Sequence, residues 1–184
     1  MKKKLFIIFV LFISLFMISG CSQKNEKSSE NNTSKEESVE PNNTVGYLKF
    51  YVPDDFQYDP DLRGLAYAEN EKKVFIKGDY YSDPYNVVSL VVYVNNAGMG
   101  AKAYADSINE NLTDEDVKYS LKSNNKITEI YAREDYVIGD EVNYAYIMDY
   151  GGYIHIVNIR GPKDKKDEMV VLLKKLFPSL VFNS

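Results

Sequence analysis

The sequence predicts an α+β domain built as an α/β/α sandwich, in which two main helices flank a largely antiparallel β-sheet. Three observations lead to this fold class. Most segments after Val45 alternate apolar and polar residues, which is the pattern of a β-strand. The segment 86–95 is apolar on both faces, as expected of a central strand covered from both sides. Two further segments, 101–112 and 162–177, carry apolar residues at helical spacing.

The first strand is expected over 47–52, with its even-numbered residues on one face. Two shorter strands follow over 65–68 and 73–77, and a polar turn over 69–71 joins them. The central strand, 86–95, comes after these and leads into the first helix.

The helix over 101–112 is amphipathic. Its apolar residues are Ala101, Tyr104, Ala105, Ile108 and Leu112. An acidic loop over 113–116 follows the helix. A strand is then expected over 127–132, and it can continue to Ile138 past an irregularity near 133–135.

The clearest hairpin joins 142–150 to 153–160 through Gly151 and Gly152. Two adjacent glycines tolerate the positive φ values of a two-residue type I′ turn. The resulting register pairs Tyr150 with Tyr153, Met148 with His155, Tyr146 with Val157, Tyr144 with Ile159 and Ile147 with Ile156, and leaves Asn143 near Arg160.

The last helix is expected to begin at Pro162, which suits the first turn of a helix, and to stop at Pro178. Its buried stripe consists of Met169, Leu172, Leu173, Leu176 and Phe177. A short apolar tail over 180–182 is expected to pack back on the sheet.

The first 20 residues have the layout of a secretory signal, with a basic start, an apolar run over 5–18 and small residues before Cys21. The run is too short to span a bilayer, which needs about 20 residues. The segment Ile18-Ser19-Gly20-Cys21 resembles a lipobox. The resemblance implies cleavage before Cys21 and a diacylglyceryl group on its thiol; the alternative is an ordinary signal peptide that contains a cysteine.

Residues 21–45 are then the lipidated cysteine and a tether. Ser, Asn, Glu and Lys dominate this segment, and Val39 is its one aliphatic residue before Val45. Such a composition cannot bury enough apolar surface to fold, so a disordered spacer is expected. The remaining residues, 46–184, have the length of a single domain.

The strand-first layout resembles the PsbP-like fold. The resemblance lies in the stretch from Gly46 to Pro53 followed by Phe56, in the long hairpin over 144–159, and in the ending Leu176-Phe177-Pro178-Ser179-Leu180. It covers 46–182 and implies a fold shared by photosystem accessory proteins and bacterial lipoproteins. It provides no active-site motif to transfer, and fold alone does not define function.

The charge balance restricts the partners. From Gly46 onward there are 16 basic and 22 acidic side chains, a net charge of −6, with no basic stripe. Nucleic acid is therefore not expected as a partner. The predicted contacts are the membrane, through lipid on Cys21 at the extracytoplasmic face, and a protein or polymer of the cell envelope. The Lys- and Asn-rich composition hints at a Gram-positive source.

Two groups of residues suggest chemistry, but each has a simpler structural explanation. His155 is the single histidine and could act as a general base or metal ligand. Its place in a strand, with no second histidine and no cysteine in the domain, favours a structural histidine beside a helix or bonded to a tyrosine. Asp54, Asp55, Asp59 and Asp61 could bind calcium, but the regular loop pattern is missing and a solvated turn is favoured.

Tyrosine is the least ordinary feature, because all 16 tyrosines follow Val45. Tyr80, Tyr81 and Tyr85 surround a turn-forming Ser-Asp-Pro sequence and are the candidate ligand-binding residues. Exposed tyrosines offer rigid amphipathic contact area. Tyrosines within strands are more simply explained by β-propensity.

No catalytic residue, metal site or cofactor is assigned, because the sequence has no nucleophile elbow, phosphate-binding glycine loop or zinc spacing. The sequence therefore predicts a membrane-tethered, non-enzymatic interaction or accessory module. The alternative is a lipoprotein that binds a small ligand or glycan on a tyrosine-lined surface. A third hypothesis is a hydrolase whose carboxylates meet only in the folded chain.

Overall fold

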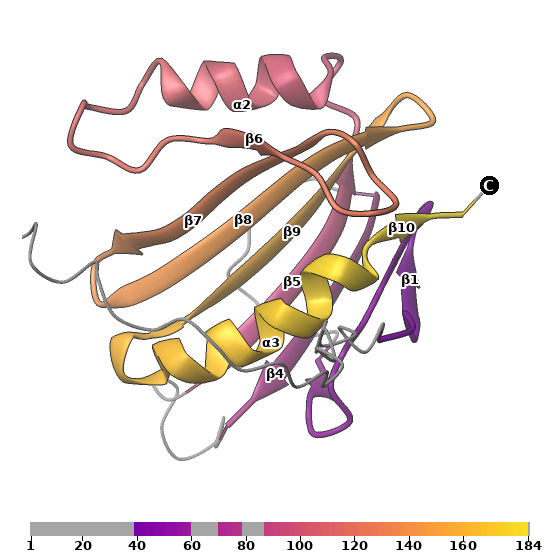
Figure 1. Cartoon of the computed structure of the whole chain (residues 1–184), viewed down its shortest axis with the longest axis vertical. Helices are drawn as coiled ribbons and strands as arrows, with labels where there is room; N and C mark the ends of the chain where they lie inside the picture. The colour runs from indigo at the N-terminus through magenta and orange to yellow at the C-terminus, as the bar shows by residue number, and fades with distance from the viewer. Residues whose placement is uncertain (1–38, 60–69, 79–86, 184) are drawn as a thin grey trace, which may run out of the picture. The chain divides into compact units, whose positions relative to one another are not determined.

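The computed structural model describes residues 39–59, 70–78 and 87–183. It confirms the predicted α+β class, with helices on both sides of a mainly antiparallel sheet (Figure 1). The predicted strand over 65–68 lies outside the described residues.

A seven-stranded antiparallel sheet forms the centre of the domain, in the order β3-β4-β5-β9-β8-β7-β6. Its strands are β3 (Gln57–Tyr58), β4 (Asn70–Lys77), β5 (Val88–Asn95), β6 (Ser120–Lys122), β7 (Ile130–Ile138), β8 (Glu141–Tyr150) and β9 (Tyr153–Pro162). As predicted, β5 lies inside the sheet, and its residues from Val88 to Val94 are buried on both faces.

A second sheet of three short strands, in the order β1-β2-β10, packs into the hydrophobic core on one face of the large sheet. These strands are β1 (Asn43–Val45), β2 (Leu48–Phe50) and β10 (Val181–Phe182). The expected strand over 47–52 is therefore shorter in the structure. The strand β1 lies in the segment predicted as tether, because Asn43–Val45 pairs with β2 and buries Val45. A three-residue strand leaves too short a pattern to be recognised by alternation.

The strand β4 begins earlier than predicted. Asn70 and Glu71 were expected in a turn, but both belong to β4, and Asn70 pairs with Val94 of β5. A register shift follows Asn70, so a bulge accommodates these residues at the end of the strand. The long neighbour β5 supplies the hydrogen-bond partners that outweigh the weak strand propensity of this segment.

The helix α2 (Ala101–Asn109) ends before the predicted Leu112. After Asn109 the chain tightens, since the amides of Asn111 and Leu112 bond to carbonyls three residues back. The strand β6, at the sheet edge, was not predicted. All three of its residues are exposed, so no buried face produces an apolar pattern.

The strand β7 starts at Ile130 and continues to Ile138 past a register shift between Arg133 and Tyr136, where an irregularity was predicted. Asp135, inside this bulge, has a φ of 57°. The β8–β9 hairpin has every predicted pair. Gly151 and Gly152 form its turn with φ values of 62° and 81°.

The two faces of the large sheet have separate cores. One face packs against β1, β2 and the helix α3 (Lys166–Ser179), which a short 3-10 turn, η2 (Lys163–Lys165), precedes. Between this face and the elements that cover it lie the most completely buried side chains of this core, which include Leu48, Phe50, Leu90, Ile130, Tyr146, Met148, Ile159, Met169, Leu176 and Leu180. The other face packs against α2 through Ala101 and Ala105.

The C-terminal segment links α3 to the three-stranded sheet. Pro178 lies in the last turn of α3, which ends one residue later than predicted, at Ser179. The buried hydroxyl of Ser179 accepts a hydrogen bond from the Tyr51 amide at 2.9 Å and donates one to the Leu176 carbonyl at 2.7 Å. The tail that follows pairs with β2 as β10.

Replacing Gly46 by Ala should destabilise the domain by about 2–4 kcal/mol, because the change adds backbone strain to overpacking. Gly46 has a φ of +56°, and a Cβ there would lie 2.6 Å from Cγ2 of Val94 and 3.1 Å from Nε2 of His155. Gly139 is the matched control, with a φ of +61° and no atom within 4 Å of its added Cβ. Its replacement by Ala should cost only about 1 kcal/mol. Equal losses in urea unfolding would contradict this packing.

Alkaline pH should destabilise the domain through Tyr146. Burial, and then the hydrogen bond that its hydroxyl donates to Glu134 at 2.8 Å, raises the pKa of Tyr146. The folded state therefore holds this proton more tightly than the unfolded state, whose tyrosines titrate near about 10. The stabilisation is complete below that pH and is lost as the pH rises above it.

The midpoint of urea unfolding is measured at a series of pH values from neutral to about 11. This range includes the pKa of a free tyrosine. Tyr146→Phe should cost about 0.5–1.5 kcal/mol at neutral pH and should show a shallower alkaline loss. Tyr58→Phe, at a 53% exposed position, is the control. An alkaline slope unchanged in Tyr146→Phe would refute the assignment.

Candidate binding site at one end of the sheet

Two turns bring aromatic side chains together at one end of the large sheet. Tyr47 lies in the turn between β1 and β2, and Tyr150 is the last residue of β8. Their ring centroids are 5.4 Å apart. The Tyr47 ring also packs tightly against the hairpin turn, because a Cβ on Gly151 would lie 2.9 Å from this ring.

The strand β10 adds a third ring. Phe182 stacks on Tyr150 with a centroid distance of 4.6 Å and an interplanar angle of 16°. The Asn183 amide donates to the Tyr47 carbonyl at 2.7 Å and holds the chain beside the turn. Tyr153 pairs with Tyr150 across the hairpin. We call Tyr47, Tyr150, Tyr153 and Phe182 the aromatic end.

His155 lies beneath these rings and is fully buried. Its Nε2 accepts a hydrogen bond from the Tyr47 amide at 3.3 Å, and its ring meets Phe182 edge-on at 5.1 Å. The imidazole therefore positions the β1–β2 turn, in agreement with the structural role expected from the sequence. Within the described part of the chain, no group of three His, Cys, Asp or Glu residues could hold a metal ion.

The aromatic end is accessible to solvent. Tyr47 is 44% exposed, and Tyr150 and Tyr153 are each 37% exposed, and the Tyr47 and Tyr150 rings are held by contacts with neighbouring rings. Partly exposed, fixed aromatic rings suit contact with another molecule, because little side-chain entropy is lost on binding.

A cavity of about 270 Å³ lies next to the aromatic end, and Phe182 belongs to both. We call it the end cavity. It is lined by Lys126, Ile127, Thr128, Glu129, Tyr131, Asp149 and Phe182. Burial raises the pKa of Tyr131, and the charge of Glu129 adds to this effect, so the phenol is neutral at physiological pH.

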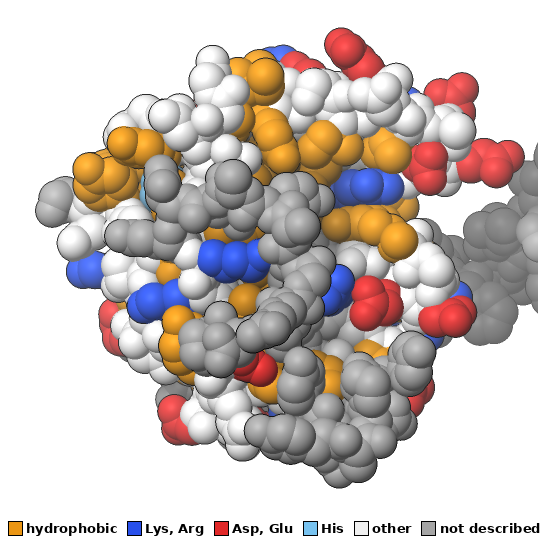
Figure 2. Space-filling model, turned by 180° about the vertical axis from the view of Figure 1, so that it is seen from behind, with side chains coloured by type: hydrophobic (Ala, Val, Ile, Leu, Met, Phe, Trp, Pro, Cys, Tyr) orange, Lys and Arg blue, Asp and Glu red, His pale blue; other side chains and the backbone are white. Residues whose placement is uncertain are grey.

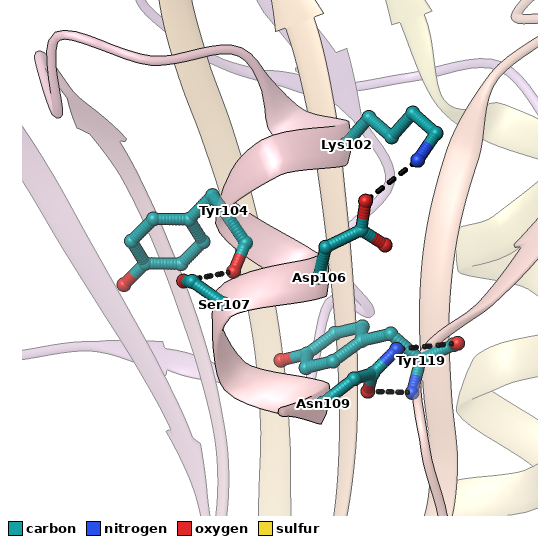
Figure 3. Close-up of polar contacts among 6 residues, drawn as sticks. All are labelled: Lys102, Tyr104, Asp106, Ser107, Asn109 and Tyr119. Atoms are coloured by element: carbon teal, nitrogen blue, oxygen red, sulfur yellow. Dashed lines mark hydrogen bonds and ion pairs between the residues drawn. The ribbon is translucent and has the colours of Figure 1, made fainter. Parts of the chain in front are cut away.

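One wall of the end cavity is tied to α2. Both carboxylate oxygens of Asp149 accept from the Ala101 amide, at 2.7 Å each, and so Asp149 caps the first turn of the helix. At the other end of α2, the Asn109 carboxamide accepts from the Tyr119 amide at 2.7 Å and donates to its carbonyl at 3.1 Å (Figure 3). The helix is thus anchored at both ends.

Two other polar contacts on α2 are local. Lys102 and Asp106 pair at 2.6 Å on the exposed side, and the Ser107 hydroxyl donates to the Tyr104 carbonyl at 2.7 Å (Figure 3). These contacts follow helical spacing and need no ligand to explain them.

The residues singled out from the sequence have different outcomes. Cys21 and the candidate ligand-binding residues Tyr80, Tyr81 and Tyr85 lie outside the described residues, as does Asp61.

Of the acidic loop, the Asp55 carboxylate pairs with Lys77 at 2.9 Å, and this hydrogen bond lowers its pKa. Lys77 also pairs with Glu168 of α3. Asp55 therefore takes part in an ion-pair network that joins the first loop to β4 and α3.

The aromatic end was not assigned as a site from the sequence. The predicted hairpin register already placed Tyr150 opposite Tyr153, and that was the available signal. The contributions of Tyr47 and Phe182 depend on contacts between residues far apart in the chain, which no local pattern reveals.

Comparisons with protein-family models and with curated proteins give no match to this chain. Among the described residues, no helix has the length and apolar character needed to cross a membrane.

Proposed function

We propose that this chain is an extracytoplasmic lipoprotein, held at the membrane by lipid on Cys21, whose domain is a non-enzymatic interaction module. It contacts a component of the cell envelope through the aromatic end. The observation that carries the proposal is the set of three partly exposed tyrosines, Tyr47, Tyr150 and Tyr153, gathered by two turns at one end of the sheet.

The attachment of the tether supports this use of the aromatic end. The β1–β2 hairpin pairs Asn43 with Phe50 at its open end, while Tyr47 lies in the turn that closes it. The Asn42 side chain donates to the Val52 carbonyl at 2.7 Å and accepts from the Val52 amide at 2.8 Å. The chain therefore enters the domain at the end of the hairpin away from Tyr47.

The charge distribution also supports an envelope partner over nucleic acid. Acidic residues outnumber basic ones from Gly46 onward. On the face turned away from the viewer in Figure 1, hydrophobic patches alternate with side chains of both charges (Figure 2). A protein that binds nucleic acid would instead need a concentrated positive surface.

The order of the elements supports the PsbP-like resemblance as part of the same proposal. The domain opens with strands, places α2 between β5 and β6, and follows a long hairpin with α3. Because such a fold hosts unrelated functions, the proposed role depends on the aromatic end and the anchor.

The anchor is tested by intact-mass analysis of the membrane fraction. The wild-type chain should lack residues 1–20 and carry diacylglyceryl mass on Cys21, and Cys21→Ala should carry no lipid. Ser22→Ala, one residue beyond the lipobox, is the matched control and should be processed normally. A wild-type chain without lipid on Cys21 would overturn this part of the proposal.

The interaction surface is tested with a photo-crosslinking benzophenone amino acid in living cells. Placed at position 153, it should give a discrete adduct, because Tyr153 lies in the aromatic end. Placed at position 58, which is 53% exposed in β3, it should not give that adduct. The double replacement Tyr47→Ser and Tyr150→Ser should reduce the adduct at position 153 about tenfold, as expected when interface aromatics are lost.

Identical adducts from positions 153 and 58, or no adduct from position 153, would argue against the aromatic end as the contact surface. Circular dichroism of each variant establishes that the fold is retained.

A further inference from the structure

We infer that the end cavity binds a single neutral sugar ring, at the end of an envelope glycan. This inference rests on the proposed function and names the chemical class of the envelope partner. It is drawn from the charge balance of the cavity, its apolar wall, its size and the way its loop is held.

The polar lining has both charge signs. Lys126 and the hydroxyls of Thr128 and Tyr131 can donate hydrogen bonds, while the carboxylates of Glu129 and Asp149 accept them. An anion such as phosphate would meet the two carboxylates, and a cation would meet the Lys126 ammonium. A neutral polyol avoids both repulsions, and its hydroxyls use donors and acceptors alike.

The remaining lining is apolar and includes an aromatic ring. Phe182 and the buried Ile127 lie in the same cavity as the polar groups. A pyranose has just this division, with hydroxyls around its rim and C–H bonds on its faces. A side of the ring that contacts Phe182 would leave its hydroxyls directed at the polar lining.

The size of the cavity limits the ligand. Its volume of about 270 Å³ is slightly below the roughly 300–1,000 Å³ of pockets for drug-sized ligands. One ring fits this space better than an extended chain. Outside the cavity, Tyr150 stacks on Phe182 and contacts Tyr47 in turn. Further sugar rings of a glycan could therefore contact these aromatic side chains.

The loop that forms part of the cavity is fixed in place by Asn124. Its Oδ1 accepts from the amides of Lys126 and Ile127, at 2.9 and 2.7 Å. Its Nδ2 donates to the carbonyls of Phe177 and Leu180, at 2.9 and 3.0 Å. One side chain thus ties the loop to the end of α3, and the cavity is formed before a ligand arrives, which reduces the entropy lost on binding.

The test is saturation-transfer NMR on the full lipidated chain. The protein is extracted in a polyoxyethylene detergent, because glycoside detergents would compete for the cavity. N-acetylglucosamine and glucose are the neutral probes, and inorganic phosphate, choline and glutamine represent anions, cations and zwitterions. We expect at least one neutral sugar to be saturated, with a Kd in the range of about 1 mM that is usual for weak ligands.

The variants Glu129→Gln and Lys126→Gln should each weaken sugar binding about tenfold, the effect of losing a charge-assisted hydrogen bond. Both side chains are exposed, so the fold should be retained. The matched controls are Glu115→Gln and Lys163→Gln, exposed positions outside the cavity lining, which should bind like wild type. Asn124→Ala should weaken binding while Lys126 and Glu129 remain, as expected of a positioning residue.

The inference is wrong if neither sugar is saturated at concentrations up to about 50 mM, well above a millimolar Kd. It is also wrong if the charged or zwitterionic probes bind in preference, or if the cavity variants bind as well as the controls. Crosslinking distinguishes this failure from failure of the proposed function. An adduct at position 153 without sugar binding overturns the end cavity as a glycan site and points to a protein partner, whereas sugar binding without the adduct overturns the aromatic end.

Discussion

The register between β8 and β9 is the constraint on which the rest of the structure depends. Because side chains alternate along a strand, Asp149 and Tyr150 must lie on opposite faces of the sheet. Asp149 caps α2 on one face, and Tyr150 stacks on Phe182 of β10 on the side of the three-stranded sheet. A slip by one residue would exchange these faces, remove the helix cap and expose the core residues of both strands. The glycine turn at Gly151–Gly152 prevents such a slip.

The same register explains why a buried histidine is tolerated. Its partner across the hairpin is Met148, and both lie on the face that carries the three-stranded sheet. There Nε2 of His155 accepts a hydrogen bond from the Tyr47 amide. This bond satisfies a backbone donor that the tight turn would otherwise leave without a partner in a strand. The one histidine of the chain thus joins the two sheets, and the aromatic end is built on that contact.

The elements that cover the two faces of the large sheet differ in the size of the side chains that they bury. The helix α3 and the small sheet bury large side chains such as Phe50 and Leu176, so this side is a packed core. The short helix α2 contributes mainly Ala101 and Ala105, and small residues let it lie close to the sheet. Asp149, which caps the start of α2, also lines the end cavity. The hairpin end, the C-terminal strand and the 126–131 segment therefore meet at one place, and the polar and aromatic groups that line the end cavity come from all three.

Much of the fold was predictable because its signals are local. The alternation in β8 and β9, the glycine pair between them, the apolar faces of β5 and the stripe of α3 are each contained in one stretch of sequence. The proposed export signal before Cys21 likewise rests on a local pattern, and the excess of acidic residues is visible from composition. Predictions failed where the pattern was short or had no buried face, as in β1 and β6.

By itself the sequence determined the α+β class, the central strand and the hairpin register, and the lipid attachment on Cys21 stays a prediction. Only the tertiary structure decided that Tyr47, Tyr150 and Phe182 form one surface and that Phe182 and Asp149 line one cavity. The physical reason is the range of the interactions. Periodicity and turn chemistry act within a few residues, whereas a site assembled from segments more than a hundred residues apart exists only after the sheets have packed.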